Sequence, residues 1–99
     1  MIYELAVMKI DVKKASEFEA AFAKAAVVFQ RAEGCHSMSL EKTLEKPSEY
    51  RLRILWESYD AHMDTFRNSE GYQECKKLVE EYFKEPPVVV HTELVEEYF

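Results

Sequence analysis

A change of pattern around Trp56 constrains this chain more than any other feature of its sequence. The residues that lead up to Trp56 favour a strand, and Ser58 is a good N-cap for a helix. The side chains that follow recur at helical spacing: Tyr59, His62, Met63 and Phe66. A polar interruption ends at Ser69, which can cap a second helix that stops before Pro86. The sequence therefore predicts a strand followed by a broken helix, which places polar side chains beside the strand end.

The residues before this junction predict a strand, a helix and a hairpin. Residues 2–10 favour a strand, and the run from Ser16 to Glu19 matches a capping box, which places the start of a helix near Ser16. Gly34 supplies the positive φ that commonly ends a helix. From Cys35 to Ser58, two runs of nearly alternating polarity flank a turn at Lys46-Pro47-Ser48, which is typical of a hairpin.

The register of this hairpin can be predicted from its apolar residues. Pairing Leu44 with Tyr50 puts the apolar sets of both strands on one face. The same register brings Met38 near Trp56, with His36 beyond them. We therefore expect Trp56 to lie on the helix-covered face of the sheet.

The order of the predicted elements is β-α-β-β-α-β, with a last strand from Val88 to Tyr98. This order is that of an α+β, ferredoxin-like fold with a four-stranded antiparallel sheet, and we expect a single domain over residues 1–99. Helices cover only one face of such a sheet, yet apolar residues occupy both faces of the last strand. We therefore expect a homodimer in which the open sheet faces of two copies pack together.

The composition argues against several classes of partner. The net charge is −6, and the 13 lysines and arginines are scattered, so a nucleic acid or an anionic membrane surface is not expected. No apolar run approaches the roughly 20 residues of a membrane span, and we expect a cytoplasmic protein. Cys35 and Cys75 are expected to be free thiols. The three histidines are too widely spaced to indicate a metal site.

Several segments together resemble the antibiotic biosynthesis monooxygenase family. They are Phe18–Phe22, the Gly34 turn, Trp56–His62, Phe66–Tyr72 and Glu85–His91. The resemblance covers nearly the whole chain and implies a dimeric α+β barrel with a ligand cavity between each sheet and its helices. In characterised members it implies oxidation of electron-rich phenols or quinols by O₂ without a cofactor, or the breakdown of haem.

Two specialised branches of that family match the chain poorly. The haem-degrading branch has an Asn in its first strand, which is absent here, and its helix Trp and His fall on Thr65 and Cys75. A branch with paired histidines on one helix would place them at Phe66 and Gly71. Haem degradation is therefore the less favoured activity.

The candidate site lies where the broken helix meets the strand. His62 could act as a general base, because the positive end of a helix favours its neutral form. Arg67 could stabilise an oxyanion or a peroxide, and the indole N–H of Trp56 could bind a ligand oxygen. The other candidate ligand-binding residues are Phe66, Tyr72, His36 and His91.

Two functions remain open at this point. One is a cofactor-free monooxygenase that uses O₂ on a small electron-rich aromatic of the phenol or quinol type, with no metal or other cofactor. The other is a dimer of the same fold that binds a small ligand without catalysis, as a sensor or accessory subunit. Fold alone does not decide between them.

Overall fold

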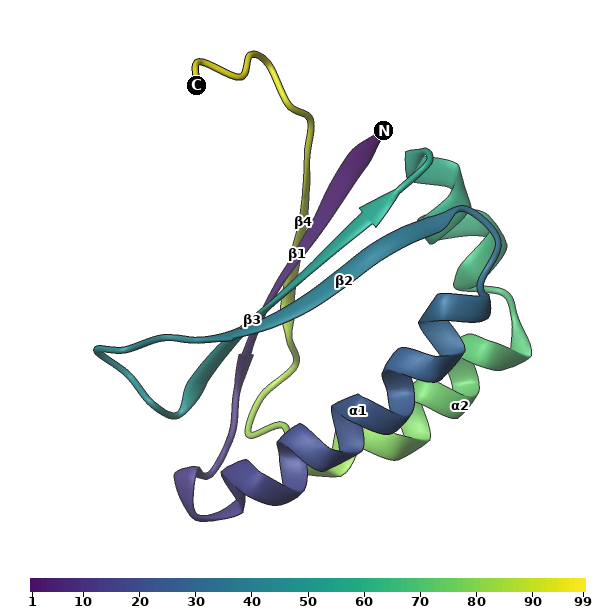
Figure 1. The fold of residues 1–99 in the computed structure, drawn as a ribbon. Coiled ribbons are helices and arrows are strands. Elements are labelled where there is room, and N and C mark those ends of the chain that lie inside the picture. The colour runs from purple at the N-terminus through teal and green to yellow at the C-terminus, as the bar shows by residue number, and fades with distance from the viewer.

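Two helices pack against one face of a four-stranded antiparallel sheet in the computed structural model, which describes residues 1–99 (Figure 1). The strands lie in the order β2-β3-β1-β4, and each neighbouring pair is antiparallel. The strands are β1 (Ile2–Lys9), β2 (Cys35–Lys42), β3 (Glu49–Trp56) and β4 (Val88–Thr92). The helices are α1 (Ala15–Arg31) and α2 (Glu70–Val79), with short helical turns at Val12–Lys14, Ala61–Phe66 and Glu80–Tyr82. The predicted ferredoxin-like α+β fold is confirmed.

The core lies between the helices and the inner face of the sheet. In α1 the buried positions follow the period of a helix: Phe18, Ala21, Phe22, Ala25, Val28 and Phe29. In the strands they alternate, so that Tyr50, Leu52, Ile54 and Trp56 of β3 all face the helices. Trp56 has no exposed surface, which confirms its predicted place on the helix-covered face.

The start of α1 lies within one residue of the prediction, but its cap differs. Ser16 lies inside the helix, which begins at Ala15 after a short turn, and Asp11 caps that turn by accepting a hydrogen bond from the Lys13 backbone N–H (3.0 Å). The expected capping box does not form, because Ser16 is not the N-cap residue, and Glu19 has another partner. Its carboxylate accepts a hydrogen bond from the hydroxyl of the buried Tyr50, which needs a partner.

The hairpin register differs from the prediction by two residues. Tyr50 pairs with Lys42 rather than with Leu44, and Met38 pairs with Ile54 rather than with Trp56. A shift of two keeps every side chain on its expected face, so the alternation of polarity cannot distinguish the two registers. The loop between the strands determines the register. Its backbone hydrogen bonds end the pairing at Thr43 and leave Leu44 in an exposed turn.

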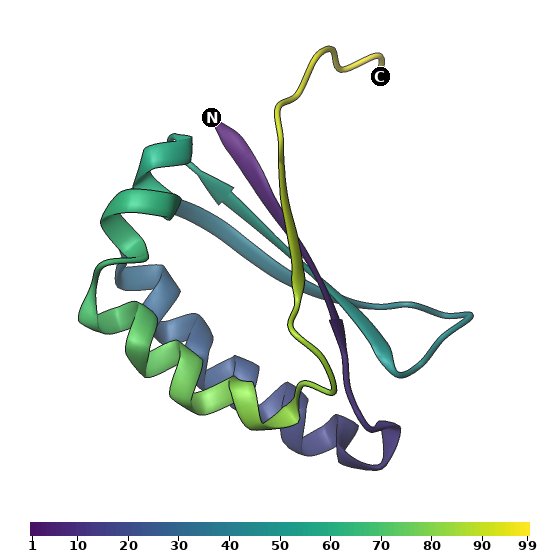
Figure 2. The same cartoon turned by 180° about the vertical axis from the view of Figure 1, so that it is seen from behind.

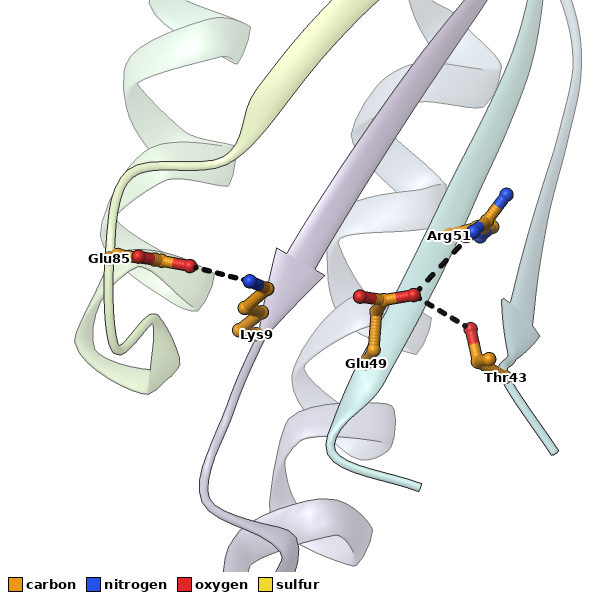
Figure 3. Close-up of polar contacts among 5 residues, drawn as sticks. All are labelled: Lys9, Thr43, Glu49, Arg51 and Glu85. Atoms are coloured by element: carbon orange, nitrogen blue, oxygen red, sulfur yellow. Dashed lines mark hydrogen bonds and ion pairs between the residues drawn. The ribbon is translucent and has the colours of Figure 1, made fainter. Parts of the chain in front are cut away.

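Polar contacts fix the loop end of the sheet (Figure 3). The Glu49 carboxylate accepts a hydrogen bond from the Thr43 hydroxyl (3.3 Å) and lies 3.5 Å from the Arg51 guanidinium. Lys9 at the end of β1 forms an ion pair with Glu85 (3.1 Å), just before β4. Both partners of that pair are half exposed, so we expect it to contribute less than about 1 kcal/mol.

The last strand is shorter than predicted. β4 ends at Thr92 and does not continue to Tyr98, because its only neighbour is β1 and the pairing ends where Tyr3 meets Thr92. Residues 93–99 then run away from the sheet without regular structure (Figures 1 and 2). Their apolar side chains are largely exposed.

The second face of the sheet carries no helix (Figure 2). Its apolar side chains include Val88 and Val90 of β4, which are 65% and 51% exposed. Arg53 covers part of this face by lying over the Tyr3 ring. No helix in the structure combines the length and the apolar character that crossing a bilayer requires.

Candidate functional site

A cavity of about 590 Å³ lies between the inner face of the sheet and the two helices. Apolar side chains from all these elements form most of its wall, among them Ala6, Met8, Phe22, Phe29, Phe66 and Val79. Four polar residues join them near the β3–α2 connection: Glu4, His62, Arg67 and Tyr72. A volume of this size, with an apolar wall and few polar groups, is typical of a small-molecule site.

Glu4 is one of the two buried polar residues of the fold, and it was not among the candidates predicted from the sequence. It lies on the inner face of β1, beside Ala6, and only 6% of its surface is exposed. Its Oε1 accepts a hydrogen bond from the Trp56 indole N–H (2.9 Å), while Oε2 has no hydrogen-bond partner within the chain. Strict alternation along β1 was the available signal, because it places Glu4 inward with Ala6 and Met8.

Burial dominates the electrostatics of Glu4. It raises the pKa of this carboxyl above the ordinary value, although the Trp56 hydrogen bond and the charge of Arg67 both act to lower it. A buried carboxyl with a raised pKa is a stronger base when ionised than an exposed one. It is therefore the type of group that can exchange a proton with a ligand near neutral pH.

His62 lies beside Glu4 and is also buried, with 3% of its surface exposed. It does not lie at the start of a regular α-helix, because the segment Ala61–Phe66 is a π-helix, in which His62 is a buried position. The wide turn is marked by the bond from the Arg67 N–H to the His62 carbonyl. The imidazole stacks on the Trp56 ring, with ring centres 5.1 Å apart.

Both ring nitrogens of His62 have partners. Nε2 lies 3.2 Å from Glu4 Oε1, and Nδ1 lies 2.8 Å from Nε2 of His91. Burial lowers the pKa of His62 to about 4, assisted by the nearby His91 and Arg67, so the ring is neutral at pH 7. An ionised Glu4 can only accept hydrogen bonds, so the proton of the neutral His62 ring lies on Nε2. Nδ1 of His62 is then an acceptor, and His91 donates to it. The helix dipole invoked from the sequence is not needed.

His91 completes a chain of hydrogen bonds that leads out of the cavity. It pairs with Glu4 across the β1–β4 ladder, and its other neighbour is Tyr59, whose ring centre is 4.8 Å away. His91 is partly exposed and does not line the cavity. The order Glu4, His62, His91 therefore runs from the cavity wall toward the surface.

Arg67 follows directly after the π-helix and lines the cavity. Its guanidinium lies over the Tyr72 ring at 5.1 Å, and its Nε is buried without a hydrogen-bond partner. Arg67 forms no ion pair in the chain, although its charge is close enough to lower the pKa of His62 and of His91.

Comparisons with known proteins agree with this architecture. A sequence model described as antibiotic biosynthesis monooxygenase matches residues 1–78. The chain belongs to this family. It is also 35% identical over 91 residues to the uncharacterised protein YczJ of Bacillus subtilis (strain 168), covering 92% of this chain and 96% of that protein.

Solved structures of antibiotic biosynthesis monooxygenase relatives share the fold. A candidate member from Bordetella bronchiseptica is 42% identical with a TM-score of 0.93, and the match covers 96% of this chain and 97% of that one. SnoaB from Streptomyces nogalater, named as a cofactor-independent oxygenase, matches with a TM-score of 0.83 at 16% identity, over 98% of this chain and 95% of that one. The second likeness shows the fold alone.

The remaining predicted site residues divide into two groups. Phe66 and Tyr72 line the cavity together with His62 and Arg67. Trp56 and His91 do not line it. Trp56 is linked to the cavity by its hydrogen bond to Glu4, and His91 by its hydrogen bond to His62. His36 lies on β2, exposed and away from the cavity, because the bulge between Cys35 and Ser37 ends the regular pairing there.

Metal-binding groups do not converge in this member of the family. No group of three His, Cys, Asp or Glu side chains lies close enough together to hold a metal ion. Cys35 and Cys75 are free thiols, as expected, and burial raises the pKa of each to about 11. Neither thiol is activated as a nucleophile.

Proposed function

We propose that this protein is a cofactor-independent monooxygenase that uses O₂ to oxidise a small, electron-rich aromatic of the phenol or quinol type. One observation carries the proposal. Glu4 faces a largely apolar cavity with a raised pKa, and Trp56 and His62 hold its Oε1 while Oε2 has no partner in the chain. This is the arrangement that a general base for a buried phenol requires.

The proposed base is thus Glu4 rather than His62. Both nitrogens of His62 are engaged and its pKa is about 4, so it orients Glu4 and offers a route for the proton through His91. In the proposed reaction, Glu4 takes the proton of the substrate hydroxyl. The guanidinium of Arg67 and the hydroxyl of Tyr72 are placed to stabilise the phenolate.

The remaining steps need no external reductant. The phenolate transfers an electron to O₂, and the two radicals combine to form a carbon–oxygen bond. Loss of the proton on that carbon then breaks the O–O bond, so that one oxygen atom stays on the ring as a quinone carbonyl and the other leaves as water. The substrate supplies all the electrons and both hydrogens of that water. The apolar wall formed by Phe22, Phe29 and Phe66 excludes solvent from these intermediates.

The family supports this proposal, since the matching model describes monooxygenases of antibiotic biosynthesis. SnoaB, whose fold is shared, is named as a cofactor-independent oxygenase. We also propose that the protein works as a homodimer formed through the open sheet face. Val88 and Val90 on that face are exposed to solvent in a single chain, and the same face of a second copy would bury them.

A second function is favoured by the internal hydrogen bonds of the polar network. Apart from Glu4 Oε2, the polar atoms that link Glu4, Trp56, His62 and His91 find partners among themselves without a ligand, as the groups of a structural network do. In this case the cavity would bind a small apolar molecule, and the dimer would act as a sensor or an accessory subunit.

Oxygen consumption separates the two functions. The purified protein, without added flavin, haem or metal, is mixed with dihydroxynaphthalenes, and O₂ uptake and quinone absorbance are recorded. We expect uptake by the wild type, near-complete loss in Glu4→Gln, and no change in His36→Gln, which alters an exposed histidine outside the cavity. Binding of the naphthalenes without uptake would favour the second function, and uptake retained by Glu4→Gln would remove the proposed base.

A further inference from the structure

The charge of the cavity differs from the charge of the chain. The protein as a whole carries −6, yet Arg67, Lys76 and Lys84 all line the cavity and none of them forms an ion pair. Two exposed carboxylates also lie at the cavity, but Glu85 is paired with Lys9 outside it, which leaves only Glu80 at the rim without a partner. Even with Glu4 ionised, the unpaired cations of the cavity lining outnumber its unpaired carboxylates, so an anion would be attracted there in spite of the acidic chain.

Arg67 is the cation of this group that lies beside the reactive end of the cavity. Lys76 and Lys84 are exposed, whereas Arg67 is partly buried next to His62 and Phe66. Its guanidinium donates no hydrogen bond within the chain, and its Nε is fully enclosed without an acceptor. Because no acceptor holds it, turning the guanidinium toward a ligand breaks no hydrogen bond of the protein.

The surroundings of Arg67 match an aromatic ligand. Phe66 and Tyr72 meet edge to face at 5.9 Å between ring centres, and Phe29 lies against Phe66 at 4.9 Å. Both Phe29 and Phe66 line the cavity, so an aromatic ligand there would contact their rings. A guanidinium above Tyr72 then provides two parallel N–H donors, which suit a carboxylate better than a neutral oxygen.

We infer that the ligand of this cavity is an aromatic acid, whose ionised carboxylate pairs with Arg67 while its ring lies among Phe29, Phe66 and Tyr72. This inference rests on the site of the proposed function and narrows its substrate to phenols that carry a carboxylate. The exposed Lys76 and Lys84 at the rim would attract such an anion on its way in.

The structure also allows a role for Arg67 without a ligand. Its charge lowers the pKa of Glu4 and so helps to keep that carboxylate ionised. If this were its only role, replacing Arg67 would affect the binding of neutral and anionic ligands equally. The two roles can therefore be separated by comparing ligands that differ only in charge.

The experiment uses a hydroxynaphthoate and the matching hydroxynaphthamide, which have the same rings and hydroxyl and differ in the charge of one group. Binding to the full-length protein is measured by calorimetry near neutral pH. We expect the acid to bind the wild type at least about tenfold more tightly than the amide, a difference of about 1.4 kcal/mol. Arg67→Gln should abolish that preference by weakening the binding of the acid more than that of the amide, while Arg67→Lys should retain part of it.

Lys77→Gln is the matched control, since it removes the same charge from an exposed position of α2 that does not line the cavity. It should retain the preference, and thermal melting should show that every variant is folded. Three outcomes would overturn the inference. The wild type could bind the acid and the amide equally, it could bind neither, or Arg67→Gln could lose affinity for both to the same extent. Preference for the acid without O₂ uptake would support the aromatic-acid ligand and count against the proposed monooxygenase function. O₂ uptake with neutral phenols alone would support the monooxygenase function and count against the aromatic-acid ligand.

Discussion

The low pKa of His62 predicts how the protein responds to acid. An isolated histidine titrates near 6.5, whereas His62 in the fold titrates near 4, because burial and the neighbouring His91 and Arg67 disfavour the imidazolium. Between these two values the unfolded chain binds a proton at this position and the folded chain does not. The contribution of His62 to stability is therefore lost as the pH falls from above 6.5 toward 4.

The size of the effect follows from the difference between the two pKa values. Each unit corresponds to about 1.4 kcal/mol, so we expect His62 to reduce the free energy of unfolding by about 2 kcal/mol at pH 5 and by about 3 kcal/mol at pH 4. Glu4 acts in the opposite direction, since its raised pKa lets the folded state take up a proton more readily. The wild-type curve alone would mix the two contributions.

Two measurements isolate His62. Urea unfolding is followed at a fixed protein concentration from pH 7 to pH 4 for the wild type and for His62→Gln, and the acid-induced loss should be smaller in the variant by about 2 kcal/mol at pH 5. His36→Gln, at an exposed position, should follow the wild type. In NMR spectra, the ring signals of His62 should keep their neutral positions down to about pH 5. A ring that titrates between pH 6 and 7 would refute the assignment of a neutral, buried donor to Glu4.

Three further substitutions test the fold. Trp56→Ala should lower the free energy of unfolding by about 3–5 kcal/mol, because Trp56 is fully buried and also holds Glu4; a loss below about 1 kcal/mol in urea unfolding would contradict its place in the core. Gly34→Ala should cost about 2 kcal/mol, because φ is +81° and the added Cβ would lie 2.8 Å from Cβ of Ala61; a melting temperature equal to the wild type would contradict this. Leu5→Lys places a charge on the open sheet face, through which we propose that the dimer forms, and should change the elution from dimer to monomer on a sizing column; an unchanged elution volume would contradict this interface.

Much of the fold could be predicted because local patterns determine it. The alternation of β3 and the stripe of α1 were sufficient to give the inner faces of both elements, and Gly34 has the positive φ expected of it. The hairpin register could not be fixed in this way, because registers two residues apart bury the same side chains. The end of β4 depends on where β1 begins, which is a property of the assembled sheet.

The candidate site could be located from the sequence but not assigned. Helical spacing placed His62, Phe66 and Arg67 near Trp56, and three of these four residues line the cavity. Their roles depend on contacts from distant segments, above all Glu4 on β1 and His91 on β4, which no local pattern connects. The π-helix also escaped prediction, and it is the feature that turns His62 inward.

Glu4 allows a decisive test of whether the polar network exists for chemistry or for stability. A carboxylate on the inner face of a sheet costs free energy, and its raised pKa shows that the fold disfavours the charge. Glu4→Gln removes that charge but keeps an oxygen that can accept from Trp56 and His62. Because a raised pKa removes stability as the pH rises through it, the variant should be more stable than the wild type at pH 8, and this gain should shrink toward pH 5. Urea unfolding at both pH values measures it. Greater stability with loss of O₂ uptake would mean that the carboxylate is retained for its reactivity, whereas a variant less stable at pH 8 would identify Glu4 as a structural ion.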